Sequence, residues 1–128
     1  MNYIHPVDFA AFDATSERVT QALLGPESGI QSCEVNCMKT PPGVGSPAGL
    51  HTHVVDQAFY ILRGTMNLEV AGETFEAGPG TLVFFPAGVP HRNWNNGPEA
   101  TIHLAINSPR PDPDRPFGHT VGEKSDSL

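Results

Sequence analysis

The hydrophobic positions of the chain fall into short runs that are bounded by glycine and proline. In most of these runs apolar and polar residues alternate with the period of two that is typical of a half-buried strand. Residues 65–80 predict a hairpin that turns at Ala71-Gly72. The alternating runs are residues 30–40, 57–64 and 100–107, and the almost wholly apolar residues 81–85 predict a buried strand.

Turn residues separate these runs. The sequence has 13 glycines and 13 prolines, and segments 41–49 and 86–90 are too rich in both to continue a helix or a central strand. Residues 17–25 fit either a strand or a short helix, and no segment shows a long helical period. The pattern predicts an all-β fold of roughly eight to ten short strands, in the sandwich or barrel class.

The length of 128 residues suits one domain. We expect this domain to span residues 1–108, with residues 1–16 as a lead-in that holds at most a short strand or turn. Residues 109–128 are rich in proline, charge and small side chains. They predict a tail that either wraps the surface or is disordered.

Composition and charge exclude some classes of function. The formal net charge of -7 leaves no basic footprint for nucleic acid or for an anionic membrane. No apolar run approaches the ~20 residues of a spanning helix, and no secretory signal is visible at the N-terminus. We therefore expect a cytoplasmic protein with neither kind of partner. Cys33 and Cys37 lie too far apart along one strand to pair, so both are predicted to be free.

Two histidines, His51 and His53, share one face of a predicted strand because they are two residues apart. This spacing suits a shared divalent ion. Gln57 can join them only if the chain reverses at residues 54–56, because a straight strand would carry it ~13 Å away. A third imidazole is expected from His91, which follows a turn whose prolines and glycine fix its position.

These residues stand in two motifs that resemble those of the cupin superfamily. The first runs Gly45, five residues, His51-Thr-His53, three residues, Gln57, six residues, Gly64, with glutamine where the family has glutamate. The second runs Gly80, five residues, Pro86-Ala-Gly88, two residues, His91, three residues, Asn95, and its match is complete.

The resemblance implies an antiparallel double-stranded β-helix, or jelly-roll barrel, with one divalent metal ion inside. The ligands it implies are His51, His53, Gln57 and His91. It also implies a homodimer. Three imidazoles and an amide suit Ni²⁺, Zn²⁺, Fe²⁺, Mn²⁺ or Cu²⁺, among which the sequence does not choose. Asp56 is an alternative ligand, one residue short of the family spacing.

The glutamine changes the expected chemistry. It removes one negative charge, so the ion is predicted to bind less tightly and to be a stronger Lewis acid. An amide cannot serve as a general base. Some cupins carry glutamine at this position, including enzymes that resemble ring-openers of pectin-derived sugars.

Further pocket residues follow from strand parity. Phe59, Ile61 and Arg63 share the face of Gln57, and Trp94 follows His91 toward the rim, so these four are candidates for a substrate pocket. In residues 101–107 a polar stripe that includes His103 either lines the interior or faces water. If the stripe lies inside, His103 is the candidate catalytic acid or base.

The leading hypothesis is therefore a metal-dependent enzyme that acts on a small, oxygen-rich metabolite by isomerisation, ring-opening or elimination. A metal-dependent dioxygenase is the second hypothesis. The third is a binding or sensing module for small molecules without catalysis. Fold alone does not separate them, because one fold hosts many chemistries.

Overall fold

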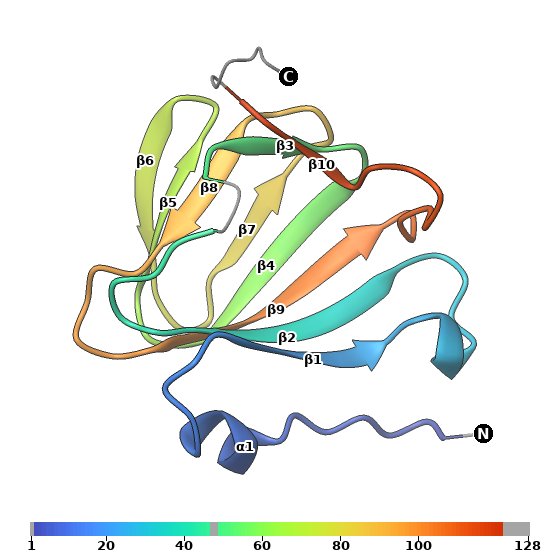
Figure 1. The fold of residues 1–128 in the computed structure, drawn as a ribbon, viewed down its shortest axis with the longest axis horizontal. Helices are drawn as coiled ribbons and strands as arrows, with labels where there is room; N and C mark the ends of the chain where they lie inside the picture. Colours follow the sequence, from blue (N-terminus) through green and yellow to red (C-terminus); the bar gives the residue numbers. More distant parts are fainter. Residues whose placement is uncertain (1, 47–48, 122–128) are drawn as a thin grey trace.

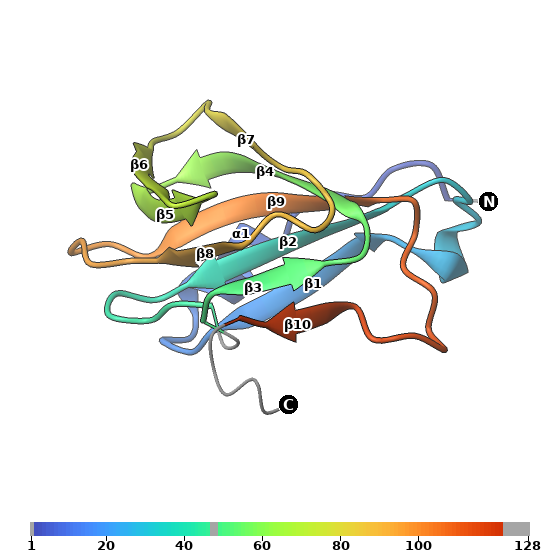
Figure 2. The ribbon, with the colours of Figure 1, turned by 90° about the horizontal axis from the view of Figure 1, so that it is seen from above.

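The computed structural model describes residues 2–46 and 49–121, which form two five-stranded antiparallel sheets (Figures 1 and 2). The first sheet has the order β1 (Val19–Leu24), β2 (Glu34–Thr40), β9 (Thr101–Ser108), β4 (Asp56–Arg63), β7 (Leu82–Phe85). The second has the order β10 (Gly118–Thr120), β3 (His51–His53), β8 (His91–Trp94), β5 (Met66–Val70), β6 (Glu73–Ala77). The predicted all-β class is confirmed, and the two sheets are consistent with a jelly-roll barrel.

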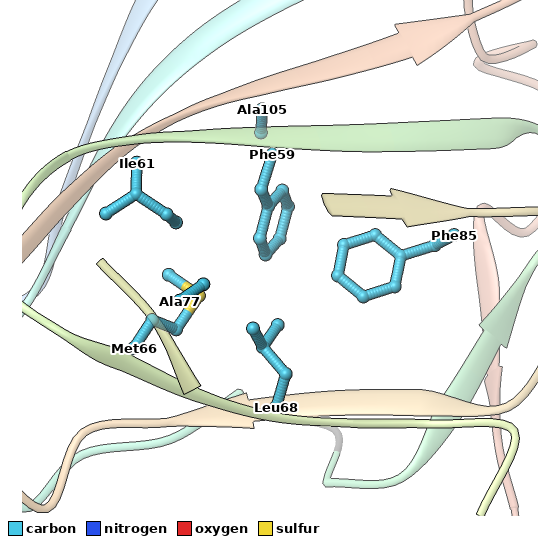
Figure 3. Close-up of a cluster of buried hydrophobic side chains, with 7 residues drawn as sticks. All are labelled: Phe59, Ile61, Met66, Leu68, Ala77, Phe85 and Ala105. Atoms are coloured by element: carbon cyan, nitrogen blue, oxygen red, sulfur yellow. The ribbon is translucent and has the colours of Figure 1, made fainter. Parts of the chain in front are cut away.

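The main core lies between the two sheets (Figure 3). Side chains of β4, β7 and β9 meet side chains of β5 and β6 there, because alternate residues of each strand point inward. The cluster consists of Phe59, Ile61, Met66, Leu68, Ala77, Phe85 and Ala105. It fills one part of the barrel interior and leaves the part beneath β3 and β8 to polar side chains.

A second core covers the outer face of the first sheet. The lead-in expected to hold at most a strand or turn contains a short helix, α1 (Phe9–Asp13), which lies against β1 and β2 in Figure 1. Phe12 is fully buried there against Cys37 and Ile102. The amphipathic spacing of so short a segment is easily missed, and its stability comes from this packing rather than from helix propensity.

Sequence patterns located most strands, with one error in burial. Residues 17–25 prove to be β1, followed by a 3-10 turn, η1 (Pro26–Ser28). The predicted hairpin at Ala71-Gly72 is confirmed, with both residues at positive φ. The buried strand predicted for residues 81–85 is wrong in part, because β7 is an edge strand whose outer face no described residue covers. Leu82 is 64% exposed and Phe84 is 58% exposed.

The predicted tail is partly built into the barrel. Strand β10 pairs with β3 at the edge of the second sheet, so the boundary expected after residue 108 left out one strand. A segment of this composition can join the sheet because strands pair through backbone hydrogen bonds, which do not depend on side-chain composition. Residues 122–128 of that tail lie outside the described residues.

The backbone around Gly64 explains why the first motif has a glycine at this position. It ends β4 with φ of +75°, and a Cβ there would lie 2.6 Å from the carbonyl oxygen of Ala100. Any other residue would clash with backbone at this position.

The cysteines are free, as predicted. Across residues 2–46 and 49–121, no helix has the length and apolar character that a membrane crossing requires.

Candidate metal centre

Three histidines converge inside the barrel. His51 and His91 are direct partners across β3 and β8, and His53 lies two residues along β3 on the same face. One ring nitrogen from each comes within 4.8 Å of the others. The ring centroids are 4.5–4.9 Å apart. The structure thus brings together the three imidazoles that the two motifs singled out.

Backbone carbonyls fix the orientation of two of these rings. Nδ1 of His51 lies 2.6 Å from the carbonyl oxygen of Gly49, and Nδ1 of His91 lies 3.0 Å from that of Val89. A carbonyl accepts only, so each Nδ1 carries the proton and each Nε2 keeps its lone pair. Nε2 of His51 lies 3.2 Å from Nε2 of His53. Nε2 of His91 has no hydrogen-bond partner among the described residues. This is the arrangement by which proteins prepare a histidine to bind a metal ion.

Aromatic rings hold the cluster on two sides. Phe85 stacks on His91 with ring centroids 4.3 Å apart, and Phe117 stacks on His53 at 4.0 Å. Phe117 comes from the segment that precedes β10. That segment can approach because residue 118 is glycine: a Cβ there would lie 2.8 Å from Nδ1 of His53. No local pattern predicted Phe117 as part of the site, since its place depends on the pairing of β10 with β3.

Gln57 faces the same cavity as the histidines. The chain reverses at Val54 and Val55, and β4 begins at Asp56 in the opposite sheet, as the first motif required. The Gln57 side chain is buried, and its Nε2 donates to Oδ1 of Asn107 at 2.9 Å. Its Oε1 has no partner among the described residues.

A carboxylate sets the orientation of that amide. Nδ2 of Asn107 donates to Oε2 of Glu34 at 2.7 Å. Because an ionised carboxylate only accepts, Asn107 must turn Nδ2 toward Glu34 and Oδ1 toward Gln57. Gln57 must then turn Nε2 toward Asn107, which leaves Oε1 as its free atom. The hydrogen-bonded chain from Glu34 through Asn107 to Gln57 is called the amide relay below.

Asp56, the alternative ligand, is placed elsewhere. Its side chain is exposed, and its Oδ1 accepts from the backbone N–H of Ala87 at 2.9 Å, which fixes the turn before β8. Among the described residues, no Asp or Glu carboxylate joins the three histidines in a ligand group.

Burial favours the neutral form of two of the three rings, those of His53 and His91. Burial, followed by the nearby His51 and His91, lowers the pKa of His53 to about 4. Burial is also the main cause that lowers the pKa of His91. A metal ion needs deprotonated imidazoles, so both rings are ready to bind one at neutral pH.

His51 and His53 line a cavity of about 450 Å³ between the two sheets. Gln57 and Phe59 line it, as parity predicted. Sequence reasoning missed Arg18 and Glu34, which also line it. Arg18 precedes β1 and Glu34 begins β2, both far from the motifs, and only the order of the strands brings them here. A larger surface hollow of about 840 Å³ near His5 holds no comparable group of ligands among the described residues.

Three of the predicted pocket residues lie outside this cavity. Ile61 is fully buried in the main core. Arg63 is at the far end of β4, where it pairs with Asp13 at 3.2 Å and lies over the Phe9 ring. Trp94 lies under the guanidinium of Arg92 rather than at the rim. Strand parity was right for Ile61, which lies beyond the end of the cavity. A register shift after Ile61 moves Arg63 off that face, and Trp94, three residues after His91, is on the other face of β8.

His103 lies in the interior, as the inward reading of its stripe predicted. It is 1% exposed, and its ring lies 4.1 Å from that of Phe59. It does not line the cavity, and neither ring nitrogen has a partner in the described part of the chain. Burial, and secondarily the charge of Arg18, lower its pKa to about 3. So weak a base does not take up a proton near neutral pH, which disfavours the catalytic role predicted for it.

This burial predicts a pH dependence of stability. Because the folded pKa of His103 is about 3 and the unfolded value is 6.5, only the unfolded chain gains this proton between those values. Its contribution to the free energy of unfolding is therefore lost as pH falls below 6.5, at up to about 1.4 kcal/mol per pH unit. In metal-free protein, urea unfolding should show a shallower decline for His103→Leu than for wild type. The exposed His119→Gln should follow wild type, and parallel curves for all three proteins would contradict the expectation.

The residues present suit a divalent metal. His51 and His53 bring their Nε2 atoms within 3.2 Å of each other, and His91 completes the three-nitrogen group. Among the described residues, Nε2 of His91 and the buried Oε1 of Gln57 have no hydrogen-bond partner. Nitrogen ligands with one oxygen are the donor set of Zn²⁺, Ni²⁺, Cu²⁺ and Fe²⁺ sites. The group His51, His53 and His91 could hold such an ion.

Comparison with known proteins agrees with this geometry. A model of the cupin domain matches residues 36–107, which is more than half of the chain. A double-sheet barrel with an interior histidine cluster defines the class, and the chain belongs to the cupin family. No curated protein sequence matches the chain significantly.

Solved structures show the same fold. The polyketide cyclase RemF from Streptomyces resistomycificus is 24% identical, with a TM-score of 0.70 over 88% of this chain and 80% of that one. The DMSP lyase DddQ from Ruegeria pomeroyi is 21% identical, with a TM-score of 0.67 over 93% of this chain and 59% of that one. A predicted oxalate decarboxylase from Thermotoga maritima is 27% identical, with a TM-score of 0.64 over 71% and 79%. Enzymes are thus common among the neighbours, with several different reactions.

Proposed function

We propose that this protein binds one divalent metal ion through His51, His53 and His91, with Oε1 of Gln57 as a fourth ligand. The observation that carries this proposal is the convergence of the three imidazoles beside an amide oxygen that has no partner among the described residues. With the ion bound, the protein acts as a metal-dependent enzyme on a small, oxygen-rich metabolite. The reaction is of the isomerisation, ring-opening or lyase type.

An ion held by these residues would supply Lewis acidity toward a carbonyl or hydroxyl oxygen of the substrate. The protein supplies the rest of the site. Phe59 and Phe117 present apolar surface to the cavity and restrict water. Proton transfer requires an acid or base that lines the cavity, and Glu34 is better placed for it than His103. Gln57 cannot take this role, because an amide does not accept a proton at neutral pH.

The test begins with metal analysis of the protein purified without chelating steps. We expect about one divalent ion per chain. The metal-loaded protein is then incubated in D₂O with a panel of small hydroxy and keto compounds, and deuterium incorporation is followed by NMR. Exchange into one of them without oxygen uptake supports isomerase or lyase chemistry.

Other outcomes of the same test would favour one of the two remaining hypotheses. Oxygen uptake that depends on the metal would favour the dioxygenase. A bound ion with ligand binding but no exchange and no oxygen uptake would favour a binding or sensing module. The absence of any stoichiometric ion would remove the function proposed here. The homodimer implied by the family also remains a prediction, and light scattering measures it.

A further inference from the structure

Arg18 is a cationic side chain in the cavity of the histidines. It directly precedes β1, at the edge of the first sheet, and it is half-buried. Its Nη1 donates to the carbonyl oxygen of Gly45 at 3.0 Å, which ties the guanidinium to the glycine that opens the first motif. Arg18 and the histidines of β3 therefore line one cavity from opposite sheets.

The positive charge of Arg18 has no acidic partner among the described residues. The ion pairs they form involve Arg63, Arg92 and Arg115 instead. Glu34 lines the same cavity, but its Oε2 accepts from Asn107 and it forms no ion pair with Arg18. Burial lowers the pKa of Arg18, although a guanidinium stays protonated in proteins. A half-buried charge without a counter-ion loses hydration that an anionic ligand would replace.

We propose, on the basis of the metal-dependent function proposed above, that Arg18 binds a carboxylate group of the substrate. The substrate is then a small organic acid whose other oxygen function faces the histidine cluster. A planar guanidinium with one nitrogen already committed to Gly45 suits a single two-oxygen group. Glu34, on the same cavity wall, disfavours a second anionic group there and suits a neutral hydroxyl.

The experiment compares two probes that differ in charge alone at one end. Pyruvate and pyruvamide have similar shapes, and both offer a keto oxygen. We expect the metal-loaded protein to bind pyruvate roughly tenfold more tightly than pyruvamide in NMR titrations, because a hydrogen bond to a charged group is stronger than a neutral one. The Nε–H signal of Arg18 should shift with pyruvate.

Variants assign the preference to this residue. Arg18→Gln should bind the two probes equally, and Arg18→Lys should keep part of the preference because it keeps the charge. Arg92→Gln is the matched control: it removes the same charge from β8 outside the cavity, and it should retain the wild-type preference. Circular dichroism of each variant shows whether the fold is kept.

Two results would overturn the assignment. One is equal affinity of wild type for both probes, and the other is a preference that persists in Arg18→Gln. Metal content is measured separately on every sample, so failure of the carboxylate site in a protein that still binds its ion leaves the metal proposal standing. A protein without an ion would contradict the proposed function itself, whatever the probe preference.

Discussion

Replacing His91 with alanine is expected to lower the affinity for Zn²⁺ by on the order of 100-fold or more. Four-ligand zinc sites in small domains bind with about 10–16 kcal/mol, which is roughly 3 kcal/mol per ligand. The side chain is 2% exposed, and its Nε2 has no partner in the described part of the protein, so no other role of that atom offsets its loss. Competition with a fluorescent chelator measures the affinity directly.

His103→Ala is the matched control for this change. Both histidines are buried in the barrel interior, but only His91 belongs to the ligand group. Both variants therefore lose a buried ring, and any general loosening of the fold would appear in both. We expect His103→Ala to keep the zinc affinity of wild type. Equal losses in the two variants, or none in His91→Ala, would show that the three imidazoles do not act as a metal site.

How much of this site could be predicted depends on how locally each residue is determined. His51, His53 and Gln57 share one short segment, so strand period and the reversal before β4 placed them together. His91 needed the second motif, because its pairing with β3 joins segments 40 residues apart. Both motifs contain glycines that the local backbone requires: Gly64 makes a close backbone contact, and Gly80 and Gly88 have positive φ. Such local requirements can be recognised in the sequence.

The remaining wall of the cavity had no such local signal. Glu34 and Asn107 meet only because β2 pairs with β9, and Phe117 reaches His53 only because β10 joins the sheet edge. The local sequence of these strands does not show which strand each of them pairs with, so neither contact could be predicted. Arg63 shows the converse error: the register of β4 shifts after Ile61, so Arg63 pairs with Ile102 of the second core and lies against α1, not on the inward face that strict alternation predicted. The period of two predicts which face of a strand a side chain occupies. Its place in the barrel depends also on the register with the neighbouring strands.

The amide relay leads to the second large effect. Replacing Glu34 with glutamine gives Asn107 a partner that can either donate or accept, so nothing forces its Oδ1 toward Gln57 any longer. The Gln57 amide can then turn its NH₂ group toward the histidines, where it cannot bind a cation. We expect the zinc affinity to fall by about 10-fold, the lower end of the range for groups that orient a metal ligand. The same chelator competition measures this change.

Loss of the Glu34 charge would also weaken cation binding through space, and a double-mutant cycle separates the two causes. In a Gln57→Ala background the relay has no amide left to orient, so Glu34→Gln should cost almost nothing further. A direct charge effect would instead persist at full size. Glu69→Gln, which removes a carboxylate paired with Arg92 outside the cavity, controls for net charge. If the cycle shows no coupling, Glu34 acts by its charge alone, and the glutamine at position 57 is not held in one orientation by its neighbours.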